Sequence, residues 1–420
     1  MIKKIEIEQK EIEAPYELPE GWKWVRLGEV CETLTGSTPS KRQPEYYGGD
    51  FPFFKPADLD QGMQLFEASE YLSESGKKCS KFIPAHSTLI CCIGSIGKSG
   101  YSLRDGTSNQ QINAAIPKSS IDSKFLFYAV NSENFKNQLW KNSSSTTISI
   151  INKSKMDNCT VPLPPTLAEQ QRIVNRIEGM FAKLDEAKEK ARNAADSFET
   201  RKAAILHQAF TGSLTAKWRK ENGISDESWE EKTIGELFSH TTGKALKKDN
   251  QNGTPHKYIT TSNLYWGEFD FSEVRTMYFS DDELEKCTAK KGDLLLCNGG
   301  DVGRAAIWNF DYEICLQNHV SKLRKKTGNI EIRLFYYYFM LSKIKGNISG
   351  KGIGISSLSA KDLLAMKINL PTLPEQQEIV RILDTVLEKE RAAKSAAEQV
   401  LEQIALLKKS ILARAFRGEL

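Results

Sequence analysis

An internal repeat constrains the fold of this chain more than any other feature of its sequence. Lys202–Leu214 (KAAILHQAFTGSL) returns 206 residues later as Lys408–Leu420 (KKSILARAFRGEL), and seven of the thirteen positions are identical. Near the same offset, Trp22–Gly36 matches Trp229–Gly243 through shared Trp, Gly-Glu and Thr-Gly residues. Self-similarity at a fixed period indicates a duplicated structural unit. We therefore expect one scaffold to be present twice.

Shorter matches keep nearly the same offset. They pair Leu163–Val174 with Leu370–Val380 (one residue inserted), Cys91–Lys98 with Cys297–Arg304, and Gln111 with Gln317. Between these blocks the two copies differ strongly in residues and in short insertions. The matched blocks therefore indicate one scaffold that is present twice, and the segments between these blocks have diverged.

Each copy ends in a long polar, alanine-rich segment with helical spacing. Residues 169–210 contain no proline and a single glycine, and their apolar residues recur at alternating intervals of three and four. This is the seam pattern of a coiled coil. The expected seam residues are Ile173, Ile177, Met180, Leu184, Phe198 and Ile205 in the first copy, and Ile379, Leu383, Val386, Val400, Ile404, Leu407 and Ile411 in the second. Glu390 is a charged break in the second seam.

The two seams are equal in length, and each needs a partner to exclude water. Because two such helices in one chain can cover each other, we expect the pair to form within the chain. A coiled coil between separate chains is the alternative.

The regions before the two helices contain short apolar or alternating runs separated by turn residues. The runs are Phe51–Lys55, Thr88–Cys92, Phe125–Ala129, His256–Thr260, Leu294–Cys297 and Ile332–Met340. This pattern predicts mixed α+β domains. The expected division is 1–162 for an N-terminal tail and first domain, 163–214 for the first helix region, 215–369 for the second domain, and 370–420 for the second helix region.

Composition excludes several classes of protein. The eight cysteines form no C-x-x-C pair, and no H-E-x-x-H motif or Cys/His cluster offers a metal site. No window approaches the roughly 18 apolar residues of a membrane-spanning helix, and the N-terminus is charged. A cytoplasmic protein is the default expectation, with no membrane partner. The net charge of +4 is compatible with a nucleic-acid partner but does not require one.

The stretch Cys92–Gly100 (CIGSIGKSG) resembles a nucleotide-binding loop at first sight. A Walker loop has the spacing G-x-x-x-x-G-K-[ST], and here only Ser95 and Ile96 separate Gly94 from Gly97. The ring of backbone donors is therefore too short to wrap a phosphate chain. We interpret the stretch as a tight turn first, a DNA-phosphate contact second, and a nucleotide hydrolase third.

The loops of both domains carry basic, aromatic and amide side chains. Lys and Arg suit contact with DNA phosphates, while amides and aromatics suit contact with bases. The candidate DNA-binding residues are Lys41, Arg42, Tyr46, Tyr47, Lys98, Arg104 and Gln111 in the first domain, and Lys244, Lys247, Lys248, Arg304 and Gln317 in the second. Any single cluster of this kind is more often a solvated surface. Its occurrence in both copies favours a function.

The combined pattern resembles the specificity subunit of Type I restriction–modification systems. The residues that carry the resemblance are Thr-Gly-Ser-Thr-Pro-Ser (35–40), Tyr-Tyr-Gly-Gly (46–49), Lys-Pro-Ala-Asp-Leu (55–59), Gly-x-Ile/Val-Gly-Lys/Arg in both copies, Leu-Pro-x-x-x-x-Glu-Gln-Gln-x-Ile-Val before the first helix, and Ala-Phe-x-Gly-x-Leu after each helix. The second copy departs from the pattern, with Thr-Gly-Lys-Ala-Leu-Lys-Lys-Asp (242–249) in place of the Thr-Pro-Ser run.

The resemblance implies two target-recognition domains separated by two long antiparallel helices, in an internal pseudo-twofold repeat. It implies a non-catalytic subunit that reads a bipartite, asymmetric site in double-stranded DNA. It also implies two methyltransferase subunits and restriction/translocase subunits as partners. S-adenosylmethionine and ATP would belong to those partners, with no cofactor in this chain. The absence of an Asn-Pro-Pro-Tyr/Phe adenine-methylation motif agrees with this.

The alternative function is a coiled-coil scaffold that reads no DNA and carries two protein-binding domains. Under that reading the helices would matter and the basic loops would not.

Overall fold

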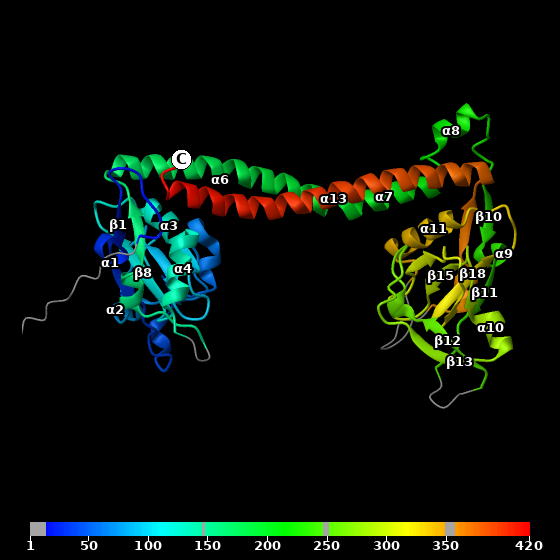
Figure 1. Ribbon diagram of the computed structural model, residues 1–420, viewed down its shortest axis with the longest axis horizontal. Helices are drawn as coiled ribbons and strands as arrows, with labels where there is room; N and C mark the ends of the chain where they lie inside the picture. Colours follow the sequence, from blue (N-terminus) through cyan, green and yellow to red (C-terminus); the bar gives the residue numbers. More distant parts are fainter. Residues whose placement is uncertain (1–13, 145–147, 247–251, 349–357) are drawn as a thin grey trace, which may run out of the picture. The chain divides into compact units, whose positions relative to one another are not determined.

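The computed structural model describes residues 14–144, 148–246, 252–348 and 358–420. The chain forms two compact units, which we call unit 1 (Met1–Arg192 with Glu398–Leu420) and unit 2 (Asn193–Ala397). The sequence colours of Figure 1 show that unit 1 combines the N-terminal domain with the C-terminal end of the last helix. Unit 1 is thus assembled from two stretches of sequence, whereas unit 2 is continuous.

Helices and strands occur in nearly the same order along the sequence of each unit. Those of unit 1 are β1 (Lys23–Arg26), α1 (Leu27–Val30), β2 (Cys31–Thr35), η1 (Pro44–Tyr46), β3 (Tyr47–Phe54), η2 (Asp58–Gln64), β4 (Tyr71–Leu72), α2 (Glu74–Lys78), β5 (Thr88–Cys91), β6 (Ser99–Tyr101), β7 (Thr107–Ser108), β8 (Ile112–Pro117), α3 (Ser123–Asn131), α4 (Glu133–Asn142), α5 (Lys153–Asp157), β9 (Thr160–Leu163) and α6 (Leu167–Asp196).

Those that follow are α7 (Phe198–Phe210), α8 (Ala216–Glu221), β10 (Glu230–Thr233), α9 (Ile234–Leu237), β11 (Phe238–Thr242), β12 (Thr254–Ile259), η3 (Thr261–Asn263), β13 (Arg275–Phe279), α10 (Asp281–Cys287), β14 (Thr288–Ala289), β15 (Leu294–Cys297), β16 (Ala305–Ile307), β17 (Ile314–Leu316), β18 (Val320–Lys325), α11 (Ile332–Ile344), α12 (Ala360–Leu364), β19 (Lys367–Leu370) and α13 (Leu373–Ala415), of which α13 continues into unit 1.

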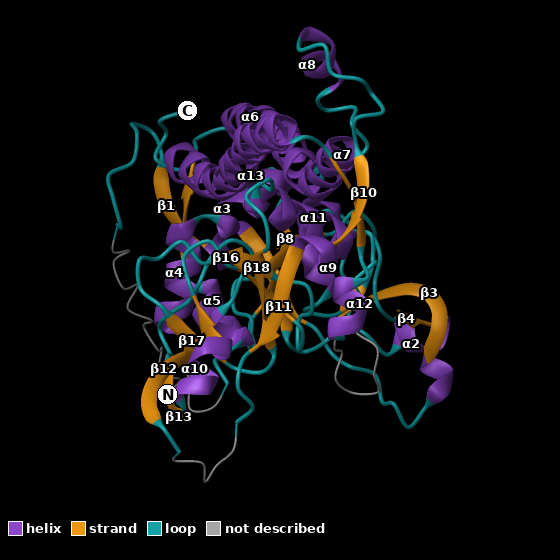
Figure 2. Cartoon of the chain, turned by 90° about the vertical axis from the view of Figure 1, so that its right-hand side faces the viewer, coloured by secondary structure: helices purple, strands orange, loops and turns teal. Residues whose placement is uncertain are grey.

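Each unit is built on a four-stranded antiparallel sheet of the same topology. The strand order is β2-β8-β5-β6 in unit 1 and β11-β18-β15-β16 in unit 2, and Figure 2 labels β11, β18 and β16 of the second sheet. A second sheet (β4-β3-β7 or β13-β12-β17-β14) and a short strand pair (β1-β9 or β10-β19) accompany it. The predicted α+β class and internal repeat are confirmed.

One of the two central strands of each sheet, β5 or β15, is a largely apolar run because both of its faces are covered. In β15, Leu294 and Leu296 pack with α11, while Leu295 and Cys297 pack against Ile259 on the other side. A strand covered on both faces loses the alternation of polar and apolar residues. The predicted runs 51–55, 88–92, 256–260 and 294–297 lie on strands, whereas 125–129 and 332–340 lie in the helices α3 and α11.

The long helices pair in antiparallel fashion within each unit. In unit 1, α6 lies along the C-terminal part of α13, since Lys408 Nζ lies 2.5 Å from Asp185 Oδ1, and Arg172 donates to the carbonyl of Leu420 at 2.9 Å. In unit 2, α7 lies along the N-terminal part of α13, where Arg201 Nε lies 2.7 Å from Glu390 Oε2. Glu390, the charged break in the second seam, therefore forms an interhelical ion pair with Arg201. The helices that cover each other belong to the same chain.

The first long helix is not continuous, contrary to the prediction for residues 169–210. It is interrupted at Ser197, where ψ is −6°. The Ser197 hydroxyl donates to the carbonyl of Asn193 at 2.6 Å, and the Arg201 guanidinium binds both that hydroxyl and the carbonyl of Ala194. Side chains that compete for main-chain acceptors in this way bend helices.

Most of the predicted seam is covered. Ile173, Ile177, Phe198, Ile379, Leu383 and Ile404 are buried, and Met180, Leu184, Ile205, Val386 and Ile411 are half-buried. The prediction is wrong for Val400 and Leu407, which are 39% and 48% exposed, while Leu387 and Leu412 are buried instead. A straight helix turns every 3.6 residues, so the buried stripe drifts away from a strict seven-residue repeat along α13.

The duplicated Glu-Gln-Gln motif at the start of α6 and α13 has a structural role. Gln170 is 2% exposed, and its Oε1 accepts from the backbone N–H of Asp122 at 2.8 Å. Gln376 is 1% exposed and makes the same bond to Glu331. Each glutamine thereby fastens the residue that caps α3 or α11 to a long helix.

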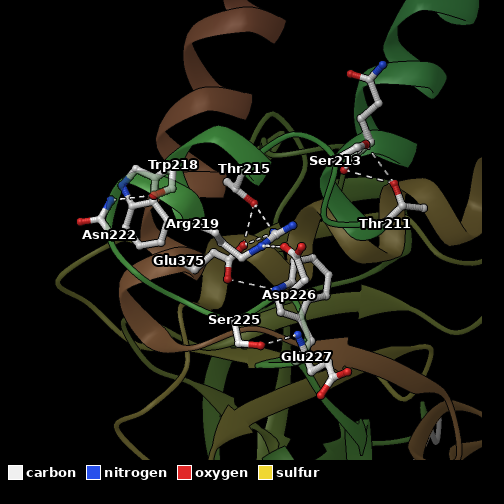
Figure 3. Close-up of polar contacts among 12 residues, drawn as sticks. Thr211, Ser213, Thr215, Trp218, Arg219, Asn222, Ser225, Asp226, Glu227 and Glu375 are labelled. Carbon is white, nitrogen blue, oxygen red and sulfur yellow. Dashed lines mark hydrogen bonds and ion pairs between the residues drawn. The ribbon is translucent and has the colours of Figure 1, made fainter.

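The neighbouring glutamate of unit 2 forms a buried polar cluster with the segment that follows α7 (Figure 3). Glu375 is 0% exposed, and its Oε1 accepts from Arg219 Nη1 at 2.6 Å and from the hydroxyl of Thr215 at 2.7 Å. Its Oε2 accepts from Trp229 Nε1 at 3.0 Å. Arg219 also pairs with Asp226 at 3.0 Å. These bonds hold residues 215–229 against the start of α13.

Candidate nucleic-acid interface

The topology gathers most of the candidate DNA-binding residues at one edge of the central sheet. Thr35 at the end of β2 pairs with Asn113 near the start of β8, and Cys91 at the end of β5 pairs with Ile112. The loops that leave these strand ends therefore meet at one edge. We call this edge the loop edge: residues 36–43, 92–98 and 109–111 in unit 1, and 243–246, 298–304 and 317–319 in unit 2.

The stretch that resembled a nucleotide-binding loop is a tight turn, as the first interpretation had it. Gly97 N–H donates to Cys91 O at 3.0 Å, and Gly303 N–H donates to Cys297 O at 2.9 Å. Gly94 and Gly97 adopt positive φ, 79° and 82°, and so do Gly300 and Gly303 in unit 2, at 68° and 94°. Because the turn folds its N–H groups back onto its own strand, they do not form a cradle for phosphates.

The basic residue that ends each turn has partners within its own unit. Lys98 Nζ lies 2.8 Å from Asp60 Oδ2. Arg304 donates to the carbonyl of Thr261 at 2.8 Å and lies over the ring of Tyr265. With side chains only 25% and 17% exposed, both cations hold the turn to a neighbouring loop. Phosphate contact by either one stays a prediction.

The sequence match of Gln111 with Gln317 is wrong by two residues. The carbonyl of Asn109 accepts from Ile112 N at 3.1 Å, and the carbonyl of Gln317 accepts from Val320 N at 2.9 Å. Asn109 is therefore the counterpart of Gln317, because the second copy is two residues longer between the glycine turn and this one. The Gln111 side chain accepts from Asn109 Nδ2 at 2.9 Å and stays within its own turn.

Lys41 and Arg42 form an exposed turn in the loop that leaves the loop edge of unit 1. Within the described part of the chain, neither side chain has an ion pair or hydrogen bond. The charges of Lys41 and Arg42 are therefore available to a ligand.

The remaining candidates of unit 1 are placed less favourably. Tyr47 donates its hydroxyl to the carbonyl of Pro39 at 2.6 Å, which fastens the loop to the start of β3, and Tyr46 is half-buried beside it. Arg104 lies over the ring of Phe66 at the opposite end of the sheet, beyond β6. The structure therefore does not bring Arg104 together with the others.

Lys244 of unit 2 is buried, contrary to what a DNA-contacting residue requires. Its Nζ donates to Glu283 Oε2 at 2.6 Å and to the carbonyl of Tyr278 at 2.7 Å. The hydrogen bond from Lys244, together with that from the backbone N–H of Ser280, holds the pKa of the Glu283 carboxyl below its usual value. Sequence reasoning could not see this pairing because Glu283 lies 39 residues away. The candidates Lys247 and Lys248 lie outside the described residues.

Two glycines bring the loops of the loop edge into contact. A methyl group on Gly36 would overlap the carbonyl oxygens of Ser108 and Asn109, and one on Gly243 would overlap the carbonyl oxygen of Leu316. The matched Thr-Gly dipeptides therefore mark places where only glycine allows two backbones to approach.

Sequence reasoning missed the polar side chains that the loop edge presents outward. The Thr38 hydroxyl donates to Oε1 of the exposed Gln110 at 2.5 Å, joining two loops of unit 1. Asn318 is the counterpart of Gln110, and Gln317 Nε2 donates to its Oδ1. A signal was available, since both residues follow an amide residue in a turn just before a strand, β8 or β18.

The described residues offer neither a group of three or more His, Cys, Asp or Glu side chains able to hold a metal ion, nor a helix long and apolar enough to cross a membrane. The loop edge is thus a polar surface of main chain, amides and cations.

Comparison with known proteins adds an independent line of observation. The family model for the Type I restriction modification DNA specificity domain matches residues 19–194 and 226–403. The chain is 24% identical over 424 residues to the Type I restriction enzyme EcoKI specificity subunit of Escherichia coli strain K12, covering 96% of this chain and 90% of that one. It is 25% identical over 415 residues to the MjaVIII specificity subunit of Methanocaldococcus jannaschii, covering 92% of each.

Solved structures agree on the fold. The HsdS subunit of Thermoanaerobacter tengcongensis aligns with a TM-score of 0.67 at 22% identity, over 97% of this chain and 99% of that one. A chain from a study of the assembly of the type I R-M system aligns with a TM-score of 0.75 at 22% identity, over 97% and 100%. The duplicated fold, the duplicated loop edge and a family model that matches both copies place this chain in the family of Type I restriction–modification DNA specificity proteins.

Proposed function

We propose that this chain is a non-catalytic subunit that reads a bipartite, asymmetric DNA site, with one half-site for each unit. The observation that carries the proposal is the loop edge itself. Its framework is the same in both units, down to the glycine turns and their hydrogen bonds, while its outward side chains differ. A scaffold kept twice with different exposed polar groups suits the recognition of two different half-sites at a fixed spacing.

In this proposal Lys41 and Arg42 bind the phosphate backbone beside the first half-site. Both are exposed and have no acidic partner among the described residues. Cations of this kind fix the protein's register on the duplex and release counterions on binding. The charges of Lys98, Arg304 and Lys244 are compensated within the protein, which supports a role in the framework first and keeps phosphate contact by Lys98 or Arg304 as a second prediction.

The proposal assigns the chemistry to partner subunits. Relatives of this chain are named as specificity subunits of Type I restriction enzymes, which supports other subunits of such an enzyme as partners. We propose that these partners are two methyltransferase subunits and restriction/translocase subunits. S-adenosylmethionine and ATP would be bound by those partners. The tight geometry of the glycine turns argues against a nucleotide site at residues 92–100.

The test is to assemble the chain with its methyltransferase partner and to map the adenines or cytosines methylated in a random DNA library. We expect one interrupted motif with two unlike halves. Uniform methylation, or a single uninterrupted motif, would reject the proposal. It would favour a scaffold whose domains bind proteins.

The phosphate contacts are tested by Lys41→Ala combined with Arg42→Ala in the same complex. We expect weaker binding to all sequences and a log–log salt slope smaller by about 2, with the motif unchanged. Lys118→Ala is a matched control, because Lys118 is exposed and follows Pro117 at the end of β8 that lies opposite the loop edge. An unchanged salt slope in the double variant would remove both residues from the interface.

A further inference from the structure

The turn that precedes β8 and β18 is held in the same way in both units. In unit 1, Asn109 N–H donates to Phe54 O at 3.2 Å, and Asn109 Oδ1 accepts from Gln111 N at 3.1 Å. The carbonyl of Gln111 accepts from Cys92 N at 2.7 Å, which ties the turn to the glycine turn beside it. The backbone on both sides of the central residue, Gln110, is thereby fixed.

Unit 2 repeats each of these bonds. Gln317 N–H donates to Ile259 O at 2.9 Å, and Gln317 Oε1 accepts from His319 N at 3.0 Å. The carbonyl of His319 accepts from Asn298 N at 3.0 Å. Asn318 takes the central place that Gln110 takes in unit 1. Gln110 is exposed and Asn318 is half-buried, and the hydrogen bonds around them, rather than sequence alignment, establish that the two residues correspond.

Hydrogen bonds orient the side chains of Gln110 and Asn318, but within the described part of the chain each side chain keeps donors and an acceptor lone pair without a partner. Thr38 donates to Oε1 of Gln110, and Gln317 donates to Oδ1 of Asn318. Each amide oxygen keeps a second lone pair, and neither amide nitrogen has a hydrogen-bond partner within the described residues. A fixed backbone with an oriented side chain and unused donors is a pre-organised binding group.

We propose that Gln110 and Asn318 are specificity-determining residues, each of which reads one base pair through the major groove in its own half-site. The inference rests on the proposed function and adds the residues and the base to it. A side-chain amide that accepts with its oxygen and donates with its nitrogen matches the N6 and N7 edge of adenine. We therefore assign adenine to the base read by each residue. Because Asn is one methylene shorter than Gln, Asn318 requires a closer approach of its turn to the base.

The chain provides its own internal control, since each residue should affect one half of the motif only. The experiment maps the methylation motif of the assembled complex with Gln110→Ala and, separately, with Asn318→Ala. For Gln110→Ala we expect one position in one half-site to lose its preference by roughly tenfold or more, with the other half unchanged. For Asn318→Ala we expect the same loss in the opposite half.

Matched control variants separate reading from general effects. Gln64→Ala and Asn309→Ala remove exposed amides, Gln64 beside Leu65, which bridges Ser102 just beyond β6, and Asn309 just beyond β16, and both should leave the motif unchanged. Gln110→Glu is a second positive test, because a carboxylate accepts from cytosine N4 and should shift the preferred base from adenine to cytosine.

The outcomes distinguish this inference from the function on which it rests. If the wild-type complex has a bipartite motif and neither alanine variant relaxes it, the reading assignment is overturned while the function stands. Loss of methylation at both halves, with Gln110→Glu equally inactive, also overturns it, because a role in folding or assembly then suffices. If the wild-type complex has no bipartite motif, the proposed function itself fails.

Discussion

Arg219→Met should destabilise unit 2 strongly, because it leaves a buried carboxylate without its cation. Glu375 is 0% exposed and the Arg219 side chain is 7% exposed, with 2.6 Å between Oε1 and Nη1. Removing one partner of a buried ion pair costs about 3–5 kcal/mol. Since Thr215 and Trp229 still donate to Glu375, we expect a loss near the lower end, about 3 kcal/mol in the free energy of unfolding.

The repeat supplies a matched control at the equivalent position of unit 1. There Glu169, the counterpart of Glu375, pairs with Arg172 at 2.8 Å, but the two side chains are 30% and 51% exposed. Exposed pairs contribute about 0–1 kcal/mol because water and salt screen them. Arg172→Met, which also loses the exposed hydrogen bond to the carbonyl of Leu420, should therefore cost about 1 kcal/mol or less.

Urea unfolding of the full chain, followed by circular dichroism, measures both variants. For a unit of this size 1 kcal/mol corresponds to about 2–4 °C in Tm, so Arg219→Met should lower the melting temperature by about 6–12 °C. Adding Glu375→Gln should recover part of the loss, because a neutral amide tolerates burial without a cation. Equal losses for Arg219→Met and Arg172→Met, or no recovery in the double variant, would refute the reasoning.

Four further predictions concern the scaffold. Gly179→Ala should raise the stability of α6 by up to about 1 kcal/mol, because the new methyl group meets nothing within 4 Å; a lower melting temperature would contradict this. Gly243→Ala should cost about 3 kcal/mol, since its methyl group would overlap a carbonyl oxygen of β17; a melting temperature equal to wild type would refute the close approach. Gln376→Leu should cost about 1–3 kcal/mol by leaving the buried N–H before α11 unpaired, and urea unfolding checks it. At pH 8 a maleimide should modify Cys79, the exposed cysteine, while burial raises the pKa of Cys92 to about 12 and keeps it an unreactive thiol until the chain unfolds, as mass spectrometry can follow.

The sequence was sufficient for the parts of the fold that repeat or that have a period. The strand Leu294–Cys297 was predictable because both of its faces are buried, which makes the run continuously apolar. The long helices were predictable from their apolar spacing, and Glu390 proved to be a pair to Arg201 rather than a flaw. The apolar run and the apolar spacing are local patterns, whereas the pairing of Glu390 with Arg201, 189 residues away, is visible only in the fold.

The candidate site was less predictable because its partners lie far apart in sequence. The charge of Lys244 is compensated by Glu283, and Arg304 is bound by the carbonyl of Thr261, 43 residues away. A cluster of lysines and arginines looks the same in sequence whether its charges are free or compensated. Gln110 was overlooked for a related reason, since its significance rests on hydrogen bonds to both sides of a turn that only the fold brings together.

The assembly of unit 1 from two stretches of sequence has a consequence for biosynthesis. Tyr16 donates to the carbonyl of Phe416 across 400 residues, and Leu412, Ala415 and Phe416 complete the same core as Phe125. When the N-terminal domain leaves the ribosome, the C-terminal residues that complete its core have therefore not yet been synthesised. Contacts between residues so far apart in sequence slow folding. The first domain to emerge must wait with part of its core open, and during that interval it is most exposed to proteases and to chaperones.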